Sequence, residues 1–168
     1  VFAGEVDDVC VWVSSIHTPE RQYEFIWRSI GFFEWDVYAV ENGEKIKLDL
    51  PGDAKLKHIF KGQALVHLKS DWTVGNRTYP QGALISFDYD RFLAGERQIQ
   101  IVVQPGERSS LVSIETTRDL LLVNMLVNVR SEMYQYHFED GHWRREKLET
   151  PGFGKISIVS VDKFSNRF

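Results

Sequence analysis

The chain has 168 residues, of which 43% are hydrophobic and 26% charged, and its formal net charge is −4. This length and composition suit a single globular domain with a sizeable core. The acidic balance argues against a nucleic-acid partner and against an anionic membrane surface, because both favour a basic protein surface. Cys10 is the single cysteine, which excludes an intrachain disulfide. Its valine neighbours predict a buried thiol in a strand, and a lone cysteine favours a cytoplasmic over a periplasmic location.

Short runs rich in Val, Ile, Leu and aromatic residues recur about every ten residues and are separated by turn residues, which predicts an all-β protein. In chain order the predicted strands are 9–16, 23–29, 36–40, 45–50, 56–60, 64–69, 83–88, 99–103, 111–115, 120–126, 132–138, 143–148 and 156–161. Asn42-Gly43 and Asp140-Gly141 are typical of type I′ hairpin turns. One short helix is expected, with Asp90 as its N-cap and Gly95 at its end.

The two hairpin turns are separated by about two units of roughly 50 residues, which is the repeat length of a four-stranded propeller blade. The sequence therefore predicts a partial β-propeller of about three four-stranded antiparallel blades plus one extra strand. The blades are expected over 9–50, 55–103 and 109–148, and a further blade is expected to start at 153–168. A β-sandwich would give similar strand spacing, so periodicity alone leaves that alternative open.

Several stretches of the sequence carry a family resemblance. They are Arg28-Ser29-Ile30-Gly31-Phe32-Phe33, Lys69-Ser70-Asp71-Trp72-Thr73-Val74-Gly75, Thr78-Tyr79-Pro80-Gln81-Gly82-Ala83-Leu84, Phe92-Leu93-Ala94-Gly95, Ser110-Leu111 with Thr116-Thr117-Arg118-Asp119, and Pro151-Gly152-Phe153-Gly154. Together they resemble the N-terminal propeller domain of the prolyl oligopeptidase family of serine peptidases. In that family the Ser-Asp-Trp-Thr-Val-Gly segment continues into an extra hairpin that ends Thr-Tyr-Pro.

The resemblance implies a seven-bladed propeller joined to a separate α/β-hydrolase domain that carries the Ser, Asp and His of the catalytic triad. The propeller would cover that domain and limit access to short peptides. By the same resemblance, a loop that begins at Arg28 and includes Phe32 and Phe33 is expected to face the substrate. Trp35 and Trp72 lie near loops and are candidates for contact with the hydrolase domain, whereas Trp12, Trp27 and Trp143 lie in strands and are expected in the core.

The sequence contains no Gly-x-Ser-x-Gly nucleophile elbow, so no catalytic residue is assigned within the chain. His137 and His142 flank a hairpin turn, which explains their spacing better than a metal site does, and no metal or cofactor is expected. The pairs Asp88 and Asp90, and Asp7 and Asp8, could in principle serve glycosidic acid–base chemistry. Helix capping and turn formation are the simpler interpretation of these carboxylates.

We therefore expect a non-catalytic propeller segment of a prolyl oligopeptidase-like peptidase, with both ends of the chain read as cuts through a longer protein. Its expected partners are the parent's hydrolase domain and short peptide substrates. Because three blades cannot close a ring, the open blade faces are also expected to drive self-association. The alternative is a stand-alone β-propeller or β-sandwich binding module without peptidase activity.

Overall fold

The computed structural model describes residues 8–150 and 154–168. Among them, no helix is long and apolar enough to cross a membrane. In chain order the elements are β1 (Cys10–His17), β2 (Gln22–Ser29), β3 (Trp35–Glu41), β4 (Glu44–Lys47), β5 (Lys55–Phe60), β6 (Gln63–His67), β7 (Trp72–Val74), β8 (Arg77–Tyr79), β9 (Leu84–Asp88), α1 (Tyr89–Leu93), β10 (Ile99–Val103), β11 (Ser109–Thr116), β12 (Leu121–Val127), β13 (Arg130–Glu139) and β14 (His142–Lys147).

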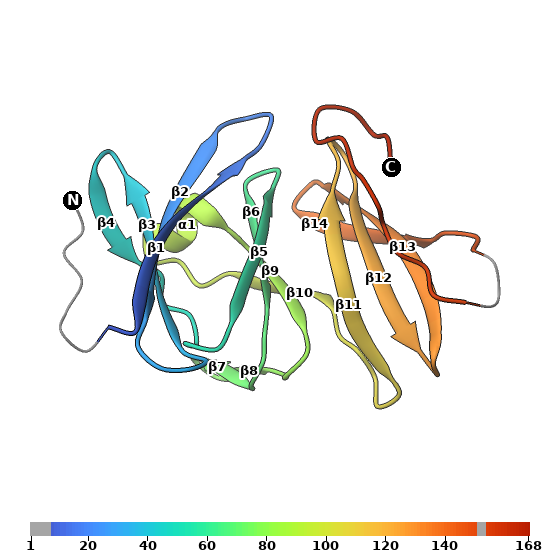
Figure 1. The fold of residues 1–168 in the computed structure, drawn as a ribbon, viewed down its shortest axis with the longest axis horizontal. Helices are drawn as coiled ribbons and strands as arrows, with labels where there is room; N and C mark the ends of the chain where they lie inside the picture. The colour runs from blue at the N-terminus through green and yellow to red at the C-terminus, as the bar shows by residue number, and fades with distance from the viewer. Residues whose placement is uncertain (1–7, 151–153) are drawn as a thin grey trace.

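These strands form three four-stranded antiparallel sheets in the orders β1-β2-β3-β4, β10-β9-β6-β5 and β11-β12-β13-β14, which we call the first, second and third blades. The three sheets follow one another across the molecule (Figure 1). Strands β7 and β8 form a separate hairpin inserted in the second blade, at the position where the resemblance implies one. The all-β, partial propeller prediction is confirmed, and the two-sheet sandwich does not describe this arrangement.

Among the described residues, four two-residue turns join neighbouring strands with the left-handed backbone that a type I′ turn requires. The predicted turns are confirmed, with φ of 52° and 82° at Asn42 and Gly43 and of 51° and 77° at Asp140 and Gly141. Lys61-Gly62 and Asn128-Val129 adopt the same conformation, and neither was predicted. Lys-Gly shares only its glycine with the Asn-Gly dipeptide that marks a type I′ turn. In Asn128-Val129 the second position is a β-branched valine, a residue type that rarely adopts positive φ.

The helix α1 begins earlier than predicted, so the assignment of Asp90 as its cap is wrong. Asp88 is extended and its side chain accepts a hydrogen bond from the Arg91 backbone nitrogen at 3.0 Å, which makes Asp88 the N-cap. Asp90 lies in the first turn and instead forms an ion pair with Arg21. Gly95 follows the C-cap with φ of 97°, as expected for a helix end.

Two hydrophobic cores lie between successive blades, which is how propeller blades pack. The core between the first and second blades includes Tyr23, Phe25, Val37, Ala39, Leu56, Ile59, Val66, Ile85, Phe87 and Tyr89. The core between the second and third blades includes Phe60, Leu65, Leu84, Val102, Val103, Ile114, Leu121, Val123, Met125 and Tyr136. Each core therefore joins two sheets, and the second blade contributes to both.

Trp27 and Trp143 pack against these cores as predicted, but two expectations about β1 are wrong. Trp12 is 40% exposed, although its ring stacks on Trp27, and Cys10 is an exposed free thiol. The reason is that β1 pairs with one neighbour, β2, and lies at the edge of its sheet. An edge strand has a neighbouring strand on one side only, so fewer residues cover its side chains than cover those of a central strand.

Residues 154–168 contain no strand, so the expected strand over 156–161 does not form here. The segment is instead held on the third blade by side chains. Asn124 donates from Nδ2 to the carbonyl oxygen of Ile156 at 2.7 Å, and the Ile156 backbone nitrogen donates to Ser131 Oγ at 3.2 Å. These bonds occupy the backbone groups of Ile156 without forming a ladder. The expected blade start at 153 and the Pro151-Gly152-Phe153 stretch lie outside the described residues, so the further blade stays a prediction.

Candidate functional site

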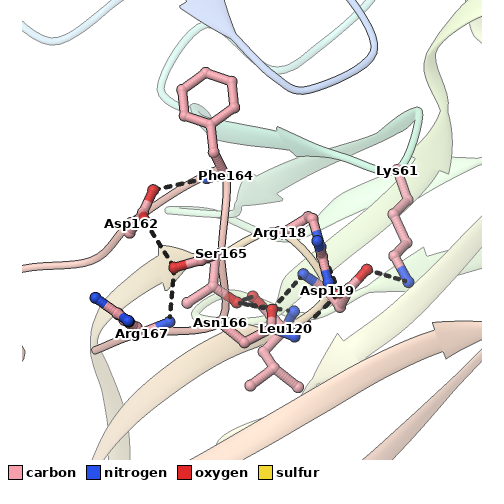
Figure 2. A network of polar contacts seen from close by, with 10 residues as sticks. Lys61, Arg118, Asp119, Leu120, Asp162, Phe164, Ser165, Asn166 and Arg167 are labelled. Carbon is pink, nitrogen blue, oxygen red and sulfur yellow. Dashed lines mark hydrogen bonds and ion pairs between the residues drawn. The ribbon is translucent and has the colours of Figure 1, made fainter.

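Polar contacts show which connections share one end of the blades. Lys61, in the β5–β6 turn, lies 3.7 Å from a carboxylate oxygen of Asp119 in the β11–β12 connection. Asn166 accepts hydrogen bonds at Oδ1 from the Asp119 nitrogen at 2.9 Å and from Thr117 Oγ1 at 3.1 Å (Figure 2). Across the first seam, Arg21 of the β1–β2 turn binds Asp90 at 2.6 Å. We call this the turn end, and it lies at the top of Figure 1.

At the second seam, the contacts around Asp119 form a connected polar network. Arg118 and Asn166 hydrogen-bond the Asp119 carboxylate and lower its pKa below the usual value. The Asp162 backbone nitrogen donates to the Arg167 carbonyl at 3.1 Å, and the Arg118 backbone nitrogen donates to the Ser165 carbonyl at 3.0 Å. These bonds dock the segment 154–168 onto the β11–β12 connection.

The opposite end, which we call the loop end, carries the connections 30–34, 68–83 and 128–129, because antiparallel strands alternate their connections between ends. The connection 30–34 is the predicted substrate-facing loop. Its base is fixed by bonds from Ser29 Oγ to the Gly31 carbonyl at 2.8 Å and from the Trp35 nitrogen to the Gly52 carbonyl at 2.8 Å. At its tip, Phe32 is 92% exposed and Phe33 is 78% exposed. The loop therefore presents two aromatic rings on an anchored base.

Arg28, the first residue of the predicted loop, lies in β2 rather than in the loop. Its Nε forms an ion pair with the Asp8 carboxylate, and both side chains are largely buried. A buried charge needs such a partner, which makes Arg28 an anchor of Asp8, just before β1. The structure therefore separates the charged residue from the two exposed phenylalanines.

The two candidate interdomain tryptophans also lie at the loop end, but both are half-buried. The Trp35 ring meets the edge of Trp12, with centroids 4.4 Å apart, and Lys55 Nζ lies 5.5 Å from its centroid. Trp72, in the inserted hairpin, packs on Tyr79 with centroids 6.1 Å apart and against the first core. Each tryptophan therefore packs mainly against its own blade, and only a minor part of its surface is exposed for contact with a partner.

A cleft of about 310 Å³ opens at the loop end of the seam between the second and third blades. His67 and Gln81 line it from the second blade, and Ser109 and Ser110 from the third. Burial, reinforced by the positive charge of Lys69, lowers the pKa of His67 to about 4. The histidine is therefore neutral at physiological pH and is not a cation for a carboxylate ligand.

No triad or metal cluster occurs among residues 8–150 and 154–168. Ser15 Oγ and His17 Nε2 lie 3.1 Å apart on exposed β1, but no described carboxylate holds the other ring nitrogen of His17. In the described part of the chain, no group of three His, Cys, Asp or Glu side chains could hold a metal ion. Asp88 and Asp90 serve as helix cap and ion-pair partner, and Asp7 lies outside the described residues. That the chain alone is inactive remains a prediction.

Val129 is the loop-end residue that sequence reasoning missed. It occupies the β12–β13 turn with φ of 67° and is 90% exposed. Positive φ is strained for a β-branched side chain, and strained residues cluster at functional sites. The preceding Asn128 was the available turn signal, but Asn-Val is not one of the dipeptides that mark a type I′ turn.

No family model matches the chain. An uncharacterized peptidase of Sinorhizobium fredii is 30% identical over 99% of the chain, which spans 24% of that relative. An uncharacterized peptidase of Rickettsia prowazekii is 27% identical over 72% of the chain and 18% of the relative.

A solved structure, a post-proline cleaving enzyme from Rickettsia typhi, matches 90% of the chain and 23% of its own length with a TM-score of 0.82 at 20% sequence identity. That match shows the fold. Together, these relatives confirm the resemblance to the prolyl oligopeptidase family. The chain spans about a quarter of the length of the proteins that it matches.

Proposed function

We propose that this chain is a non-catalytic propeller segment of a serine peptidase and that its loop end faces the hydrolase domain of the parent protein. The curated relatives are peptidases about four times as long as this chain, which leaves room for a separate catalytic domain. The parent would hydrolyse short peptides, after proline by analogy with the named function of the structural neighbour.

The observation that carries the proposal is the uneven distribution of exposed apolar side chains between the two ends. At the loop end Ile30, Phe32, Phe33 and Val129 are all exposed. At the turn end the blades present polar turns, and the exposed Phe164 lies on the segment 154–168 rather than on a blade. These turns are Thr18-Pro19-Glu20-Arg21, Asn42-Gly43, Lys61-Gly62, Thr117-Arg118-Asp119 and Asp140-Gly141. Exposed apolar side chains that gather in one place mark interaction surfaces, so the loop 30–34 makes the loop end the better docking surface.

The loop 30–34 supplies the aromatic anchors for such contact. Aromatic side chains bury about 150–250 Å² each when a partner covers them, and they dominate interface energetics. The anchored base of the loop limits the conformational entropy lost on docking. We infer that Phe32 and Phe33 contact either the hydrolase domain or a bound peptide, and that the loop narrows the path to the triad.

The test uses the full-length parent with Phe32 and Phe33 both replaced by serine. Docking and gating predict that cleavage of a short prolyl chromogenic peptide falls by about tenfold or more and that peptides longer than the usual substrates become accepted. Phe164→Ser is the matched control, because Phe164 is exposed but lies in the turn-end segment. Equal substrate-length profiles in the parent, the double variant and the control would refute the role of the loop.

The chain on its own is proposed to self-associate through its open blade faces. On the first blade, Val9 and Val13 are exposed on the face opposite the first core, and Val159 and Phe168 are exposed on the segment beside the third blade. Sedimentation of the chain should show association that increases with concentration and weakens in Val13→Lys. A monomer at all concentrations would contradict this proposal.

The stand-alone binding module remains the competing function. It would require no hydrolase domain in the same polypeptide, so the coding sequence around this segment separates the two hypotheses. A cytoplasmic compartment is proposed on the exposed free thiol of Cys10, since oxidising compartments favour paired cysteines. Cell fractionation of the parent protein tests it, and recovery from the periplasm would refute it.

A further inference from the structure

The loop-end cleft between the second and third blades has a lining that carries positive charge and no negative charge. Lys69 is the lining residue that is charged at neutral pH, because burial keeps His67 neutral. None of the described residues that line the cleft is an aspartate or a glutamate, and Glu107 adjoins the lining residue Gly106 without lining the cleft itself. An anion can therefore enter the cleft without meeting a carboxylate in its lining.

The charge of Lys69 has no partner in the described part of the chain. No ion pair joins its ammonium to a described carboxylate. Asp71, two residues further along, accepts the Gln81 backbone nitrogen at 2.7 Å, and Asp53 accepts the Ser70 hydroxyl at 3.1 Å. These two carboxylates hold the connection 68–83 in place, whereas Lys69 is exposed at the rim of the cleft.

Other lysines add to the positive field at this end of the second blade. Burial first, and then the charges of Lys69 and Lys57, lower the pKa of His67 to about 4. Burial and the same two lysines lower the pKa of Lys55, and Asp53 offsets part of that effect. Like charges that gather in this way attract an anion, because a bound anion relieves their repulsion.

Two hydrogen-bond donors accompany the lysine. The hydroxyl of Ser110 belongs to the third blade and the carboxamide of Gln81 to the second, and neither side chain bonds to a described residue. A carboxylate accepts hydrogen bonds through two oxygens and donates none, so it matches an ammonium, a hydroxyl and an amide. A cationic ligand would instead be repelled by Lys69. The lining therefore favours a carboxylate over an amine.

Hydrogen bonds fix both walls of the cleft. On the third-blade side, Ser109 Oγ accepts from the Gly106 nitrogen at 2.7 Å, and the Ser109 nitrogen donates to the Gly106 carbonyl at 3.0 Å. On the second-blade side, the Leu68 nitrogen donates to the Ala83 carbonyl at 2.9 Å, and the Gly82 nitrogen donates to the Leu68 carbonyl at 3.0 Å. The volume of about 310 Å³ suits the terminal part of a peptide rather than a folded partner.

We propose that this cleft binds the carboxylate of a short peptide, with Lys69 as the charged partner and with Ser110 and Gln81 as hydrogen-bond donors. The proposal rests on the proposed function, since it takes the loop end as the side that meets substrate. It adds a preference for peptides that carry a carboxylate, at the C-terminus or on an acidic side chain. Lys69 is then a specificity-determining residue, because its ammonium favours one class of peptide without acting on the scissile bond.

The test titrates the ¹⁵N-labelled 168-residue chain, at low ionic strength, with acetyl-prolyl-glycine and with its C-terminal amide. The backbone amide signals of Gln81, Gly106 and Ser110 are followed. We expect saturable shifts with the free carboxylate and an affinity about three- to fivefold weaker for the amide. Lys69→Met should weaken binding of the carboxylate by the same factor, and Lys69→Arg should retain it. Lys45→Met, at an exposed lysine of the first blade, is the matched control and should bind like the wild type.

Further ligands identify the source of the carboxylate. Acetyl-glutamyl-glycinamide carries only a side-chain carboxylate, so its affinity relative to acetyl-prolyl-glycine shows which of the two carboxylates is preferred. Equal shifts with the carboxylate and amide forms, or carboxylate binding that is unchanged in Lys69→Met, would overturn the proposal. Inorganic phosphate that binds as tightly as either peptide would show a general anion site, and the peptide assignment would be wrong.

The full-length parent separates this proposal from the proposed function. The ratio of kcat/KM for a prolyl peptide with a carboxylate to kcat/KM for its amide should exceed one and fall toward one in Lys69→Met. Absence of turnover with both peptides would refute the proposed function, while the titration of the chain still decides whether the cleft binds a carboxylate. An equal ratio in the wild type and in Lys69→Met, with turnover intact, would overturn the role of the cleft alone.

Discussion

The indole nitrogen of Trp143 in the third blade donates a hydrogen bond to Ser86 Oγ in the second blade at 2.7 Å. Ser86 is fully buried, and the Trp143 ring lies against Phe60 of the second blade with centroids 5.9 Å apart. A polar bond and a ring contact thus act together across one seam. This pairing fixes the third blade on the second at a position where the two blades would otherwise be held by apolar contacts.

Replacing Trp143 with Phe should destabilise the chain by about 1–3 kcal/mol, because it leaves the buried Ser86 hydroxyl without its partner. The loss should also loosen the seam, so trypsin should cut faster at Arg108 in the exposed connection between the two blades. Thermal unfolding and limited proteolysis measure the two effects.

Trp27→Phe provides the matched control. Trp27 Nε1 makes an equivalent 2.7 Å bond to Ser14 Oγ, but both residues lie in the first blade. This variant should lose stability without faster cleavage at Arg108. Equal acceleration of cleavage in both variants would show that the Trp143 bond has no special role at the seam.

Stability should fall as pH drops from about 6.5 toward 4, because two buried histidines resist protonation in the folded chain. Burial, with the nearby charge of Lys163, lowers the pKa of His58 to about 4. Burial, together with the positive charge of Lys69, likewise lowers the pKa of His67 to about 4. The unfolded chain binds these protons near pH 6.5 and the folded chain does not, so the penalty is absent above about 6.5 and grows below it.

Each histidine contributes up to about 3 kcal/mol of destabilisation at the acid end of this window. His58→Gln should remove the part of the acid destabilisation that His58 contributes, since glutamine is polar but does not titrate. Urea unfolding at a series of pH values measures the slopes, and His17→Gln on exposed β1 is the control. Parallel pH profiles for the wild-type chain and His58→Gln would contradict the assignment to His58.

Val129→Gly should stabilise the chain by roughly 0.5–1 kcal/mol, because it relieves the left-handed strain of a β-branched residue and costs some backbone entropy. In the full-length parent, the same change should weaken docking of the hydrolase domain if, as we propose, that domain covers the loop end. Gly141→Val, in the equivalent turn with φ of 77°, should destabilise by a comparable or larger amount. A lower melting temperature for Val129→Gly would show that the turn is not strained.

The fold was largely predictable because its signals are local. Strand spacing and the Asn42-Gly43 and Asp140-Gly141 turns depend on residues that lie next to one another in sequence, and the structure confirms them. Burial across a seam is not local. The exposure of Cys10 and Trp12 depends on which face a neighbouring sheet covers, and the choice of Asp88 over Asp90 as helix cap depends on where β9 ends.

The resemblance indicated the loop with Phe32 and Phe33, and the structure shows both rings exposed. That this loop faces substrate stays a prediction. The buried pairing of Arg28 with Asp8 joins residues that are not neighbours in the sequence. No spacing rule indicates it.

The central claim is that catalysis lies outside this segment, and active-site labelling tests it most directly. An activated serine reacts with a fluorophosphonate probe, so the full-length parent and the 168-residue chain are labelled side by side and assayed on a prolyl chromogenic peptide. We predict labelling and turnover in the parent, with the modified serine outside residues 1–168, and neither in the chain alone. A labelled serine within these residues, or turnover by the chain, would contradict it.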